Sequence, residues 1–494
     1  PASRRPGSNY SQHRQLPEPL GRCATIAISI MKKQKNLTQL AVEAPAVLLD
    51  KTITATGATA TAVNNRIPGG VNVVKKTKDY WHALGPGLTT GAADDDPSGV
   101  ATYSQTGAQF GYSYLWLAPI TLPLMAVVQE MCARIGMVTG RGLAANIRLH
   151  FSNRVLRVVT LMLFAANTFN LGADLGAIAK AVQLLAPNVP FWSLVVGFAA
   201  LSLLMQIFTP YAKYARYLKW LALVLLSYVI SALLAQLNWG EILRSTVTPN
   251  LHFTKESLLL ICAILGTTIS PYLFFWQTSQ EVEEQIEEGK ITLRQRRVAT
   301  HPDAMKRMRI DIWSGMFLSN LSFFFIVAAC GGVLHTQGIT NITSAAQAAE
   351  ALRPFAGEAT YLLFTIGIVG VGLLAIPVLA GSSSYAIAES LKWKSGLHQP
   401  LRQAYAFYGV IIISMLVGLG LNFIGLDPIK ALIYSAVGNG LVAPVVLFFI
   451  VKMGSSKAIM GRWRNRTIPT IIGWVTFAVM LVSGVAAIWA LLTA

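Results

Sequence analysis

The chain of 494 residues is 53% hydrophobic and only 13% charged, whereas soluble domains carry about 25% charged residues. Its net charge of +18 does not indicate a nucleic-acid partner, because the lysines and arginines cluster in short segments between long apolar runs. The four cysteines are scattered, without the spacing of a metal site or a disulfide framework. These features predict a polytopic integral membrane protein.

The N-terminal segment, residues 1–79, is polar, rich in Pro, Ser and Thr, and without sustained hydrophobic periodicity. This composition predicts a disordered segment. The chain begins with Pro1, and "MKKQKNLTQL" at Met31 is an alternative translation start. We expect the membrane domain to occupy residues 80–494.

Long apolar windows recur along the rest of the chain. A helix needs about twenty apolar residues to cross a bilayer, and this rule predicts an all-α protein with about eleven transmembrane helices. The predicted spans are about 83–105, 112–138, 155–186, 190–209, 217–238, 256–281, 309–335, 359–391, 403–424, 428–452 and 467–492.

Basic residues concentrate in five connections between these spans. Cytoplasmic loops carry an excess of Lys and Arg, and with the N-terminus inside all five connections fall on the cytoplasmic side. This consistency supports the predicted number of spans. The basic segments are 140–154, 211–219, 290–309, 392–402 and 452–466.

Two spans contain helix breakers in their interior. The first carries "GAADDDPSGV" (91–100) around Pro97, and the sixth carries "GTTISPYLFFWQTSQ" (266–280) around Pro271. Proline removes an amide donor, and in lipid the freed backbone groups must face protein or a water-filled cavity. One interpretation is a pair of ordinary proline kinks. The other is the central site of a transporter, which two broken helices at matching positions indicate.

The spacing of the two breaks favours the transporter. Five crossings separate them, so the broken helices enter the membrane from opposite sides, as in a five-plus-five inverted repeat. Repeat one would cover about 83–238 and repeat two about 256–452, with an extra helix at about 467–492.

The acidic residues at the first break indicate a cation site. Asp96 lies directly before Pro97, and a carboxylate inside a span is by default a functional candidate. Carbonyls freed at a break add the oxygen ligands that hard or borderline cations prefer. Neighbouring residues on a helix point about 100° apart, so Asp94 and Asp95 are expected to face an aqueous vestibule or a partner.

Two further polar stretches each allow two interpretations. Asn167, Asn170 and Asp174 in the third span follow the spacing i, i+3, i+7 and share one helix face. That face could line the transport pathway or form a hydrogen-bonded contact with another helix. The acidic stretch "EVEEQIEEGK" (281–290) is expected to be a solvated extension of the sixth span, with an outlet that attracts cations as the alternative.

These stretches resemble the Nramp family of divalent-metal transporters. The similarity covers most of the chain from about residue 80 and is carried by "DPSG" (96–99), "QTGAQFGY" (105–112) and "QEMCARIGMVTGRGLA" (129–144). The resemblance implies a LeuT-like fold of two inverted five-helix repeats. It also implies transport of manganese or iron(II), usually with protons.

The chain departs from the family pattern at several expected ligands. The resemblance places the metal-binding aspartate at Asp96 and a ligating carbonyl at Ala93. The family's asparagine falls on Gly99, and its Met-Pro-His motif in the sixth span falls on "SPY" (270–272). The soft methionine sulfur, which favours transition metals, is thereby replaced by the hard hydroxyl of Ser270.

The proton-linked positions also differ. The resemblance places the family's histidines at Tyr272 and Gln277. Its acidic pair in the third span falls at Asn170 and Ala173, one residue before Asp174, and its glutamine in the tenth span falls at Ala436, a turn before Asn439. The expected metal ligands are therefore Asp96, Ala93, Ser270 and Thr267. The expected pathway residues are Asp95, Gly99, Tyr272, Gln277, Asn170, Asp174 and Asn439, with helix breaks at Pro97 and Pro271.

These departures resemble the Nramp-related magnesium-transporter branch, which lacks the methionine and is thought not to be proton-coupled. We therefore expect alternating-access transport of a divalent metal ion, Mg²⁺ or Mn²⁺ before Fe²⁺, with weak or no proton coupling. The first alternative is an ordinary proton-coupled Mn²⁺/Fe²⁺ importer, and the second is a sodium/solute symporter of the same fold.

A membrane enzyme holding Mg²⁺ for a pyrophosphate substrate is disfavoured, because the later spans carry no second aspartate-rich motif. We expect no cofactor beyond the transported metal ion and no obligate protein partner. The lipid bilayer, as the inner membrane of a bacterium, is the expected location.

Overall fold

The structure, a computed structural model, describes residues 80–81, 83–251, 253–342, 345–424 and 428–492. Over these residues the chain forms helices and turns and no strand. The predicted disordered segment 1–79 and the alternative start at Met31 lie outside the described residues. The long helices are α5 (Leu117–Thr139), α7 (Asn153–Leu185), α8 (Phe191–Phe208), α15 (Pro302–Val333), α16 (Ala345–Ser390), α17 (Tyr405–Leu421), α18 (Pro428–Ser455) and α20 (Thr467–Leu492).

The first and sixth predicted spans are each divided into two helices. The first consists of α3 (Pro86–Asp94) and α4 (Pro97–Phe110), and the sixth of α12 (Lys255–Thr268) and α13 (Pro271–Glu287). The fifth runs through α9 (Tyr211–Leu221), a short 3-10 turn and α10 (Leu226–Leu234). The remaining short helices are α6 (Leu143–His150), α11 (Trp239–Val247), α14 (Leu293–Val298) and α19 (Lys457–Met460).

The number of spans agrees with the sequence prediction. Within the described residues, 9 helical segments are long and apolar enough to cross a membrane. The shorter apolar helix α17 and the broken pair α3–α4 complete the predicted eleven. The helix α16 begins well before its predicted span of about 359–391, because it includes an additional helical segment ahead of a kink at Gly357.

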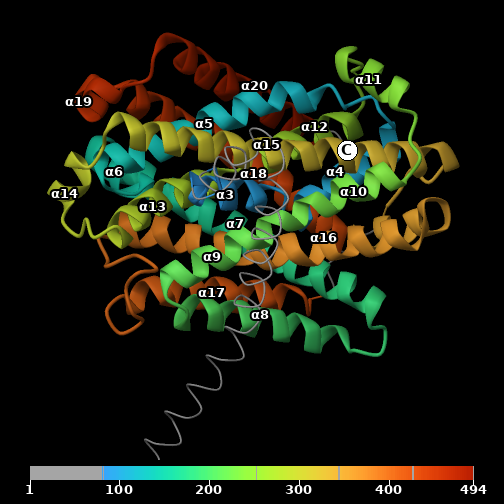
Figure 1. The fold of residues 1–494 in the computed structure, drawn as a ribbon, viewed down its shortest axis with the longest axis horizontal. Helices are drawn as coiled ribbons and strands as arrows, with labels where there is room; N and C mark the ends of the chain where they lie inside the picture. The colour runs from blue at the N-terminus through green and yellow to red at the C-terminus, as the bar shows by residue number, and fades with distance from the viewer. Residues whose placement is uncertain (1–79, 82, 252, 343–344, 425–427, 493–494) are drawn as a thin grey trace, which may run out of the picture. The chain divides into compact units, whose positions relative to one another are not determined.

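Both predicted helix breaks are confirmed. Pro97 and Pro271 each occupy the first turn of the second half-helix. A backbone amide in the first turn has no intrahelical acceptor, so proline removes no hydrogen bond there. The pair α3–α4 runs in the opposite direction to α12–α13 (Figure 1). Two broken spans that run in opposite directions are what a five-plus-five inverted repeat, as expected from the sequence, requires.

The broken helices lie in the middle of the bundle, in direct backbone contact with their neighbours. A Cβ atom built on Gly91 of α3 would lie 2.2 Å from the carbonyl oxygen of Gly315 on α15. One built on Gly266 of α12 would lie 2.1 Å from the carbonyl oxygen of Ala436 on α18. Small residues allow this close approach, which is a common mode of helix association in membranes.

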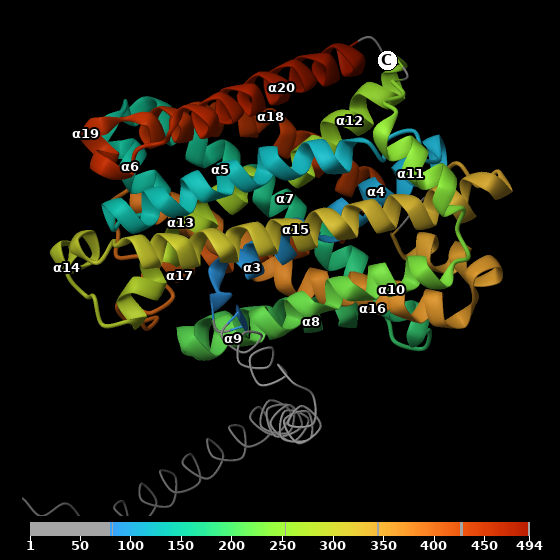
Figure 2. The ribbon, with the colours of Figure 1, turned by 45° about the horizontal axis from the view of Figure 1, so that its top comes forward.

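The outer helices present apolar side chains to the surroundings. α20 lies along one edge of the bundle against α18 (Figure 2), while α8 and α17 lie at the opposite edge (Figure 1). Leu204 and Phe208 on α8 and Val482 and Val485 on α20 are exposed. An apolar outer surface over long helices is the property of a protein that faces lipid.

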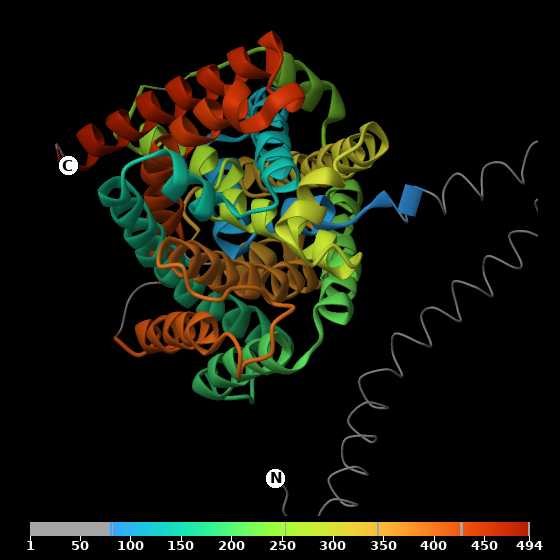
Figure 3. The ribbon, with the colours of Figure 1, turned by 90° about the vertical axis from the view of Figure 1, so that its left-hand side faces the viewer.

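The basic connections gather at one end of the bundle. α6, α14, α19 and the connection 391–404 lie at the left of Figure 1, and Figure 3 looks onto this end. These segments carry four of the five predicted basic stretches, and α9, which carries the fifth, begins at the same end (Figure 1). We refer to it below as the basic end.

Candidate metal site

Asp96 occupies the start of α4, in the gap between the two halves of the first span. Its Oδ1 atom accepts hydrogen bonds from the backbone N–H of Gly99 at 2.8 Å and from the hydroxyl of Ser98 at 2.5 Å. The side chain therefore caps the N-terminus of α4, whose partial positive charge stabilises a carboxylate. This geometry follows directly from an aspartate placed before a helix-starting proline.

The second carboxylate oxygen of Asp96 faces two other helices. Its Oδ2 atom lies 2.7 Å from Nδ2 of Asn170 on α7 and 3.2 Å from the hydroxyl of Tyr272 on α13. Only 1% of Asp96 is exposed. Donors from α4, α7 and α13 thus converge on one buried carboxylate, and both repeats of the fold contribute to its surroundings.

Tyr272 joins the two halves of the site. Its hydroxyl lies 2.8 Å from the carbonyl oxygen of Ala93 and 3.2 Å from Oδ2 of Asp96. Ala93 is in the last turn of α3, where the helical carbonyls lose their intrahelical partners. The two oxygens that the sequence predicts as metal ligands therefore approach the same point from either side of the first break.

Ser270 and Thr267, at the second helix break, form no hydrogen bond with Asp96. The Ser270 hydroxyl lies 2.9 Å from the carbonyl oxygen of Gly266 and 2.7 Å from that of Thr267, so its hydrogen bonds run to α12 and not to Asp96. The Thr267 hydroxyl is buried without a hydrogen-bond partner. The Thr267 hydroxyl oxygen lies 2.9 Å from the position that a Cβ atom on Gly99 would occupy. A side chain in place of Gly99 would therefore collide with the Thr267 hydroxyl.

The polar face of α7 is divided between two environments. The Nδ2 atom of Asn167 lies 2.8 Å from the hydroxyl of Ser382 and 3.0 Å from that of Ser383, both on α16. Asn167 therefore forms a contact between helices, whereas Asn170 reaches Asp96. Asp174 is fully buried beside Asp96, and neither of its carboxylate oxygens has a hydrogen-bond partner.

Two other predicted pathway residues form no hydrogen bond with the Asp96 carboxylate. Gln277 on α13 accepts a hydrogen bond from the Thr90 hydroxyl at 2.5 Å and donates to Oε1 of Glu281 at 2.9 Å. Gln277 thereby links α3 to α13 through a hydrogen bond. Asn439 on α18 is buried, and both polar atoms of its amide lack partners.

Asp311 holds the first half-helix in place, a role that sequence reasoning missed. Its carboxylate accepts the backbone N–H groups of Gly85 at 2.7 Å, Gly87 at 2.6 Å and Leu88 at 3.0 Å. The first amides of a helix have no intrahelical partner, so α15 supplies the cap that α3 lacks in its own sequence. Only a three-dimensional contact across more than 200 residues could reveal it.

Replacing Asp311 with alanine is expected to destabilise the protein. The change leaves three amides of α3 without acceptors, and an unsatisfied buried group costs about 1–3 kcal/mol. The apparent melting temperature of the detergent-purified protein should fall clearly. Asp303→Ala, which removes an exposed carboxylate from the same helix, serves as the control and should melt like the wild type. Equal melting of Asp311→Ala and Asp303→Ala would show that the cap contributes nothing.

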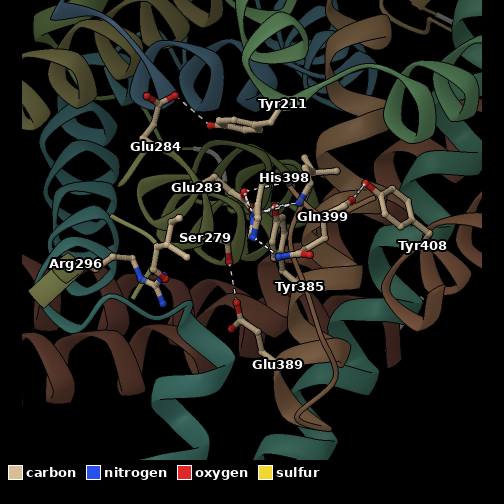
Figure 4. Close-up of polar contacts among 12 residues, drawn as sticks. Tyr211, Ser279, Glu283, Glu284, Arg296, Tyr385, Glu389, His398, Gln399 and Tyr408 are labelled. Carbon is tan, nitrogen blue, oxygen red and sulfur yellow. Dashed lines mark hydrogen bonds and ion pairs between the residues drawn. The ribbon is translucent and has the colours of Figure 1, made fainter. Parts of the chain in front are cut away.

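The sequence predicted that the acidic stretch 281–290 is a solvated extension of the sixth span. This is only partly correct, because Glu287 and Glu288 are exposed whereas Glu281 and Glu283 are buried. Figure 4 shows Tyr385 and His398 beside Glu283. The Glu283 carboxylate lies 2.8 Å from the Tyr385 hydroxyl, 2.5 Å from Nδ1 of His398 and 3.0 Å from the backbone nitrogen of Leu397. Both Glu281 and Glu283 are buried. The connection between α16 and α17 folds over this part of α13 at the basic end, which removes it from solvent.

The arrangement defines a class of protein. Oppositely directed broken helices meet at a buried carboxylate, inside a bundle whose outer surface is apolar. These are the features of an integral membrane transporter with a central ion site. Within the described residues, no group of three or more His, Cys, Asp or Glu side chains is placed to hold a metal ion.

Comparison with known proteins identifies the family. The model of the "Natural resistance-associated macrophage protein-like" (Nramp) family matches residues 87–490, and the chain belongs to this family. It is 25% identical over 422 residues to the divalent metal cation transporter MntH of Deinococcus radiodurans, covering 83% of this chain and 90% of that protein. The MntH of Mycobacterium tuberculosis is 26% identical over 417 residues, with coverage of 82% and 90%.

The solved structures agree on the fold. A manganese transporter of Eremococcus coleocola superposes with a TM-score of 0.65 at 19% identity, covering 82% of this chain and 86% of that one. The chain is therefore a transporter with the LeuT-like arrangement of two inverted five-helix repeats, and not an enzyme.

Proposed function

We propose that this Nramp-family transporter of divalent metal cations binds its ion between the two helix breaks and moves it by alternating access. The Asp96 carboxylate and the Ala93 carbonyl are the primary ligands. The observation that carries this assignment is that both oxygens approach the Tyr272 hydroxyl, at 3.2 Å and 2.8 Å. A small cation that takes the place of the hydroxyl would contact the same two oxygens.

The chemistry of the surroundings favours a hard ion. Carboxylate, carbonyl and hydroxyl oxygens suit Mg²⁺ and Mn²⁺, whereas a thioether would favour softer transition metals. The hydroxyl residues Ser270 and Thr267 stand in the sixth span where the resemblance predicts a methionine and a backbone ligand. We propose Mg²⁺ and Mn²⁺ as the leading substrates and Fe²⁺ after them. The structural relative from Eremococcus coleocola is a manganese transporter, which supports manganese as one of the two.

Transport is proposed to be weakly proton-coupled or uncoupled. The positions that correspond to the family's histidines hold Tyr272 and Gln277, and neither side chain titrates near neutral pH in water. Both are instead engaged in hydrogen bonds that join α3 and α13. An inner bacterial membrane with the basic end in the cytoplasm is the proposed location, supported by the bacterial MntH relatives and by the grouping of basic segments.

The test is ion uptake by proteoliposomes containing the purified protein. Uptake of Mg²⁺ and Mn²⁺ is measured with and without an inward proton gradient, together with the internal pH. Uptake should be independent of the gradient, and the lumen should not acidify. Manganese uptake accompanied by proton influx would support an ordinary proton-coupled importer. Sodium-dependent amino-acid uptake that metals do not inhibit would support the symporter.

A further inference from the structure

The three consecutive aspartates at the first break have opposite surroundings. Asp96 has four hydrogen-bond donors around its carboxylate. Asp95 is 0% exposed, and neither of its carboxylate oxygens has a partner. Asp94 is also 0% exposed and receives one hydrogen bond, from the Ser319 hydroxyl to Oδ2 at 3.0 Å, which leaves its Oδ1 free.

Asp94 and Asp95 do not share the hydrogen-bond partners of Asp96. Asp96 is directed toward α7 and α13, whereas Asp94 and Asp95 both lie beside Ser319 of α15. Asp95 also lies beside Ser322, one turn further along the same helix. The carboxylates at the break therefore have partners on different helices: α7 and α13 for Asp96, and α15 for Asp94.

A buried hydroxyl is directed at the same place from α4. Tyr103 is 0% exposed, its ring packs on Phe323 with 4.6 Å between centroids, and its hydroxyl has no hydrogen-bond partner. The Cε2 atom of its ring lies 3.5 Å from the position of a Cβ atom on Gly99, where the partnerless Thr267 hydroxyl (2.9 Å) and the Asp94 carbonyl oxygen (3.4 Å) also lie. Tyr228 of α10, also buried without a partner for its hydroxyl, is near Asp95.

Three carboxylate oxygens of this cluster, Oδ1 of Asp94 and both oxygens of Asp95, accept no hydrogen bond. A buried carboxylate without a partner is costly, and two adjacent carboxylates also repel each other. The cluster lies at the C-terminal end of α3, where the helix dipole adds partial negative charge. A divalent cation would neutralise both carboxylates, and carboxylate and hydroxyl oxygens are the ligands that hard divalent cations take.

We propose that Asp94 and Asp95, with the hydroxyls of Tyr103 and Ser319, form a second divalent-cation site between the first helix break and α15. This inference rests on the proposed function, because it assigns a second ion to the same transporter. The two sites share the break but no side-chain ligand. In this proposal the chain holds two divalent ions at once.

The test counts bound ions. Equilibrium binding of radioactive Mn²⁺ to the purified full-length protein in nanodiscs should give two ions per chain. Asp95→Asn should bind one ion, and Asp96→Asn should also bind one, because each change removes a different site. Tyr103→Phe, which removes only a hydroxyl, should weaken the second ion at least about tenfold. Asp303→Asn, at an exposed position on α15, is the matched control and should still bind two.

The outcomes separate this inference from the proposed function. One ion in the wild type, lost in Asp96→Asn and kept in Asp95→Asn, overturns the second site and leaves the first intact; Asp95 would then carry a proton. Binding that Asp96→Asn does not reduce overturns the proposed function itself. If Asp95→Asn does not elute as a monodisperse species, Tyr103→Phe decides, and unchanged binding of two ions in that variant contradicts the proposal.

Discussion

Asp96→Ala is expected to abolish uptake of Mg²⁺ and Mn²⁺ by proteoliposomes. Asp96 supplies a carboxylate that accepts hydrogen bonds from α4, α7 and α13, and the opposing Ala93 oxygen carries only a partial charge. Losing the charged ligand should weaken ion binding at least about a hundredfold, which corresponds to roughly 2.8 kcal/mol. The measurement is initial uptake rate against ion concentration, so that loss of binding is separated from loss of turnover.

Two variants make this result interpretable. Asp303→Ala removes an exposed carboxylate far from the break in sequence and should transport like the wild type. Asp96→Asn keeps the shape of the side chain and one acceptor oxygen for the cap of α4, and should fold but still fail to transport. Undiminished uptake by Asp96→Ala, in protein that reconstitutes normally, would disprove the assignment of this residue as the metal ligand.

Gly266→Val is expected to prevent assembly of the transporter. A Cβ atom at this position would lie 2.1 Å from the Ala436 carbonyl oxygen and 2.6 Å from the Gly440 backbone nitrogen. Both contacts are with backbone, so no side chain can turn aside, and the two helices would have to separate. Overpacking costs typically about 1–3 kcal/mol, and a backbone collision belongs at or beyond the upper end. The measurement is the yield of monodisperse protein in size-exclusion chromatography.

Gly197→Val is the matched control. Gly197 lies in α8, a helix at the edge of the bundle, and a Cβ atom there would meet no atom within 4 Å. The same substitution should therefore leave yield and melting temperature nearly unchanged. If Gly266→Val also gave a normal yield and the wild-type melting temperature, the close contact between α12 and α18 would not be essential to the fold.

The features that the sequence predicted correctly are those with a local cause. The spans follow from apolar length, and the two breaks follow from Pro97 and Pro271, which cannot continue a helix. The position of Asp96 at the start of α4 is local too, because an aspartate before such a proline is well placed to cap the following helix. Its burial at the centre was expected from its position in the middle of an apolar span.

The features that the sequence did not reveal depend on which helices pack together. Asn167 and Asn170 are three residues apart on the same face, yet one contacts α16 and the other reaches Asp96. Ser270 has the composition of a metal ligand, but its hydroxyl bonds to the end of α12. The acidic stretch after the sixth span was expected to be solvated, and the 391–404 connection buries Glu283.

The sequence by itself therefore determined the class of protein, the number and breakage of its spans, and the acidic centre, because bilayer thickness and proline geometry act on each segment separately. Only the tertiary structure decided the partners of each polar group. It brought Tyr272 to Ala93 and Asp96, and Asp311 to the start of α3. In a bilayer the backbone groups freed at a helix break must find partners within the protein, and here those partners come from helices distant in sequence.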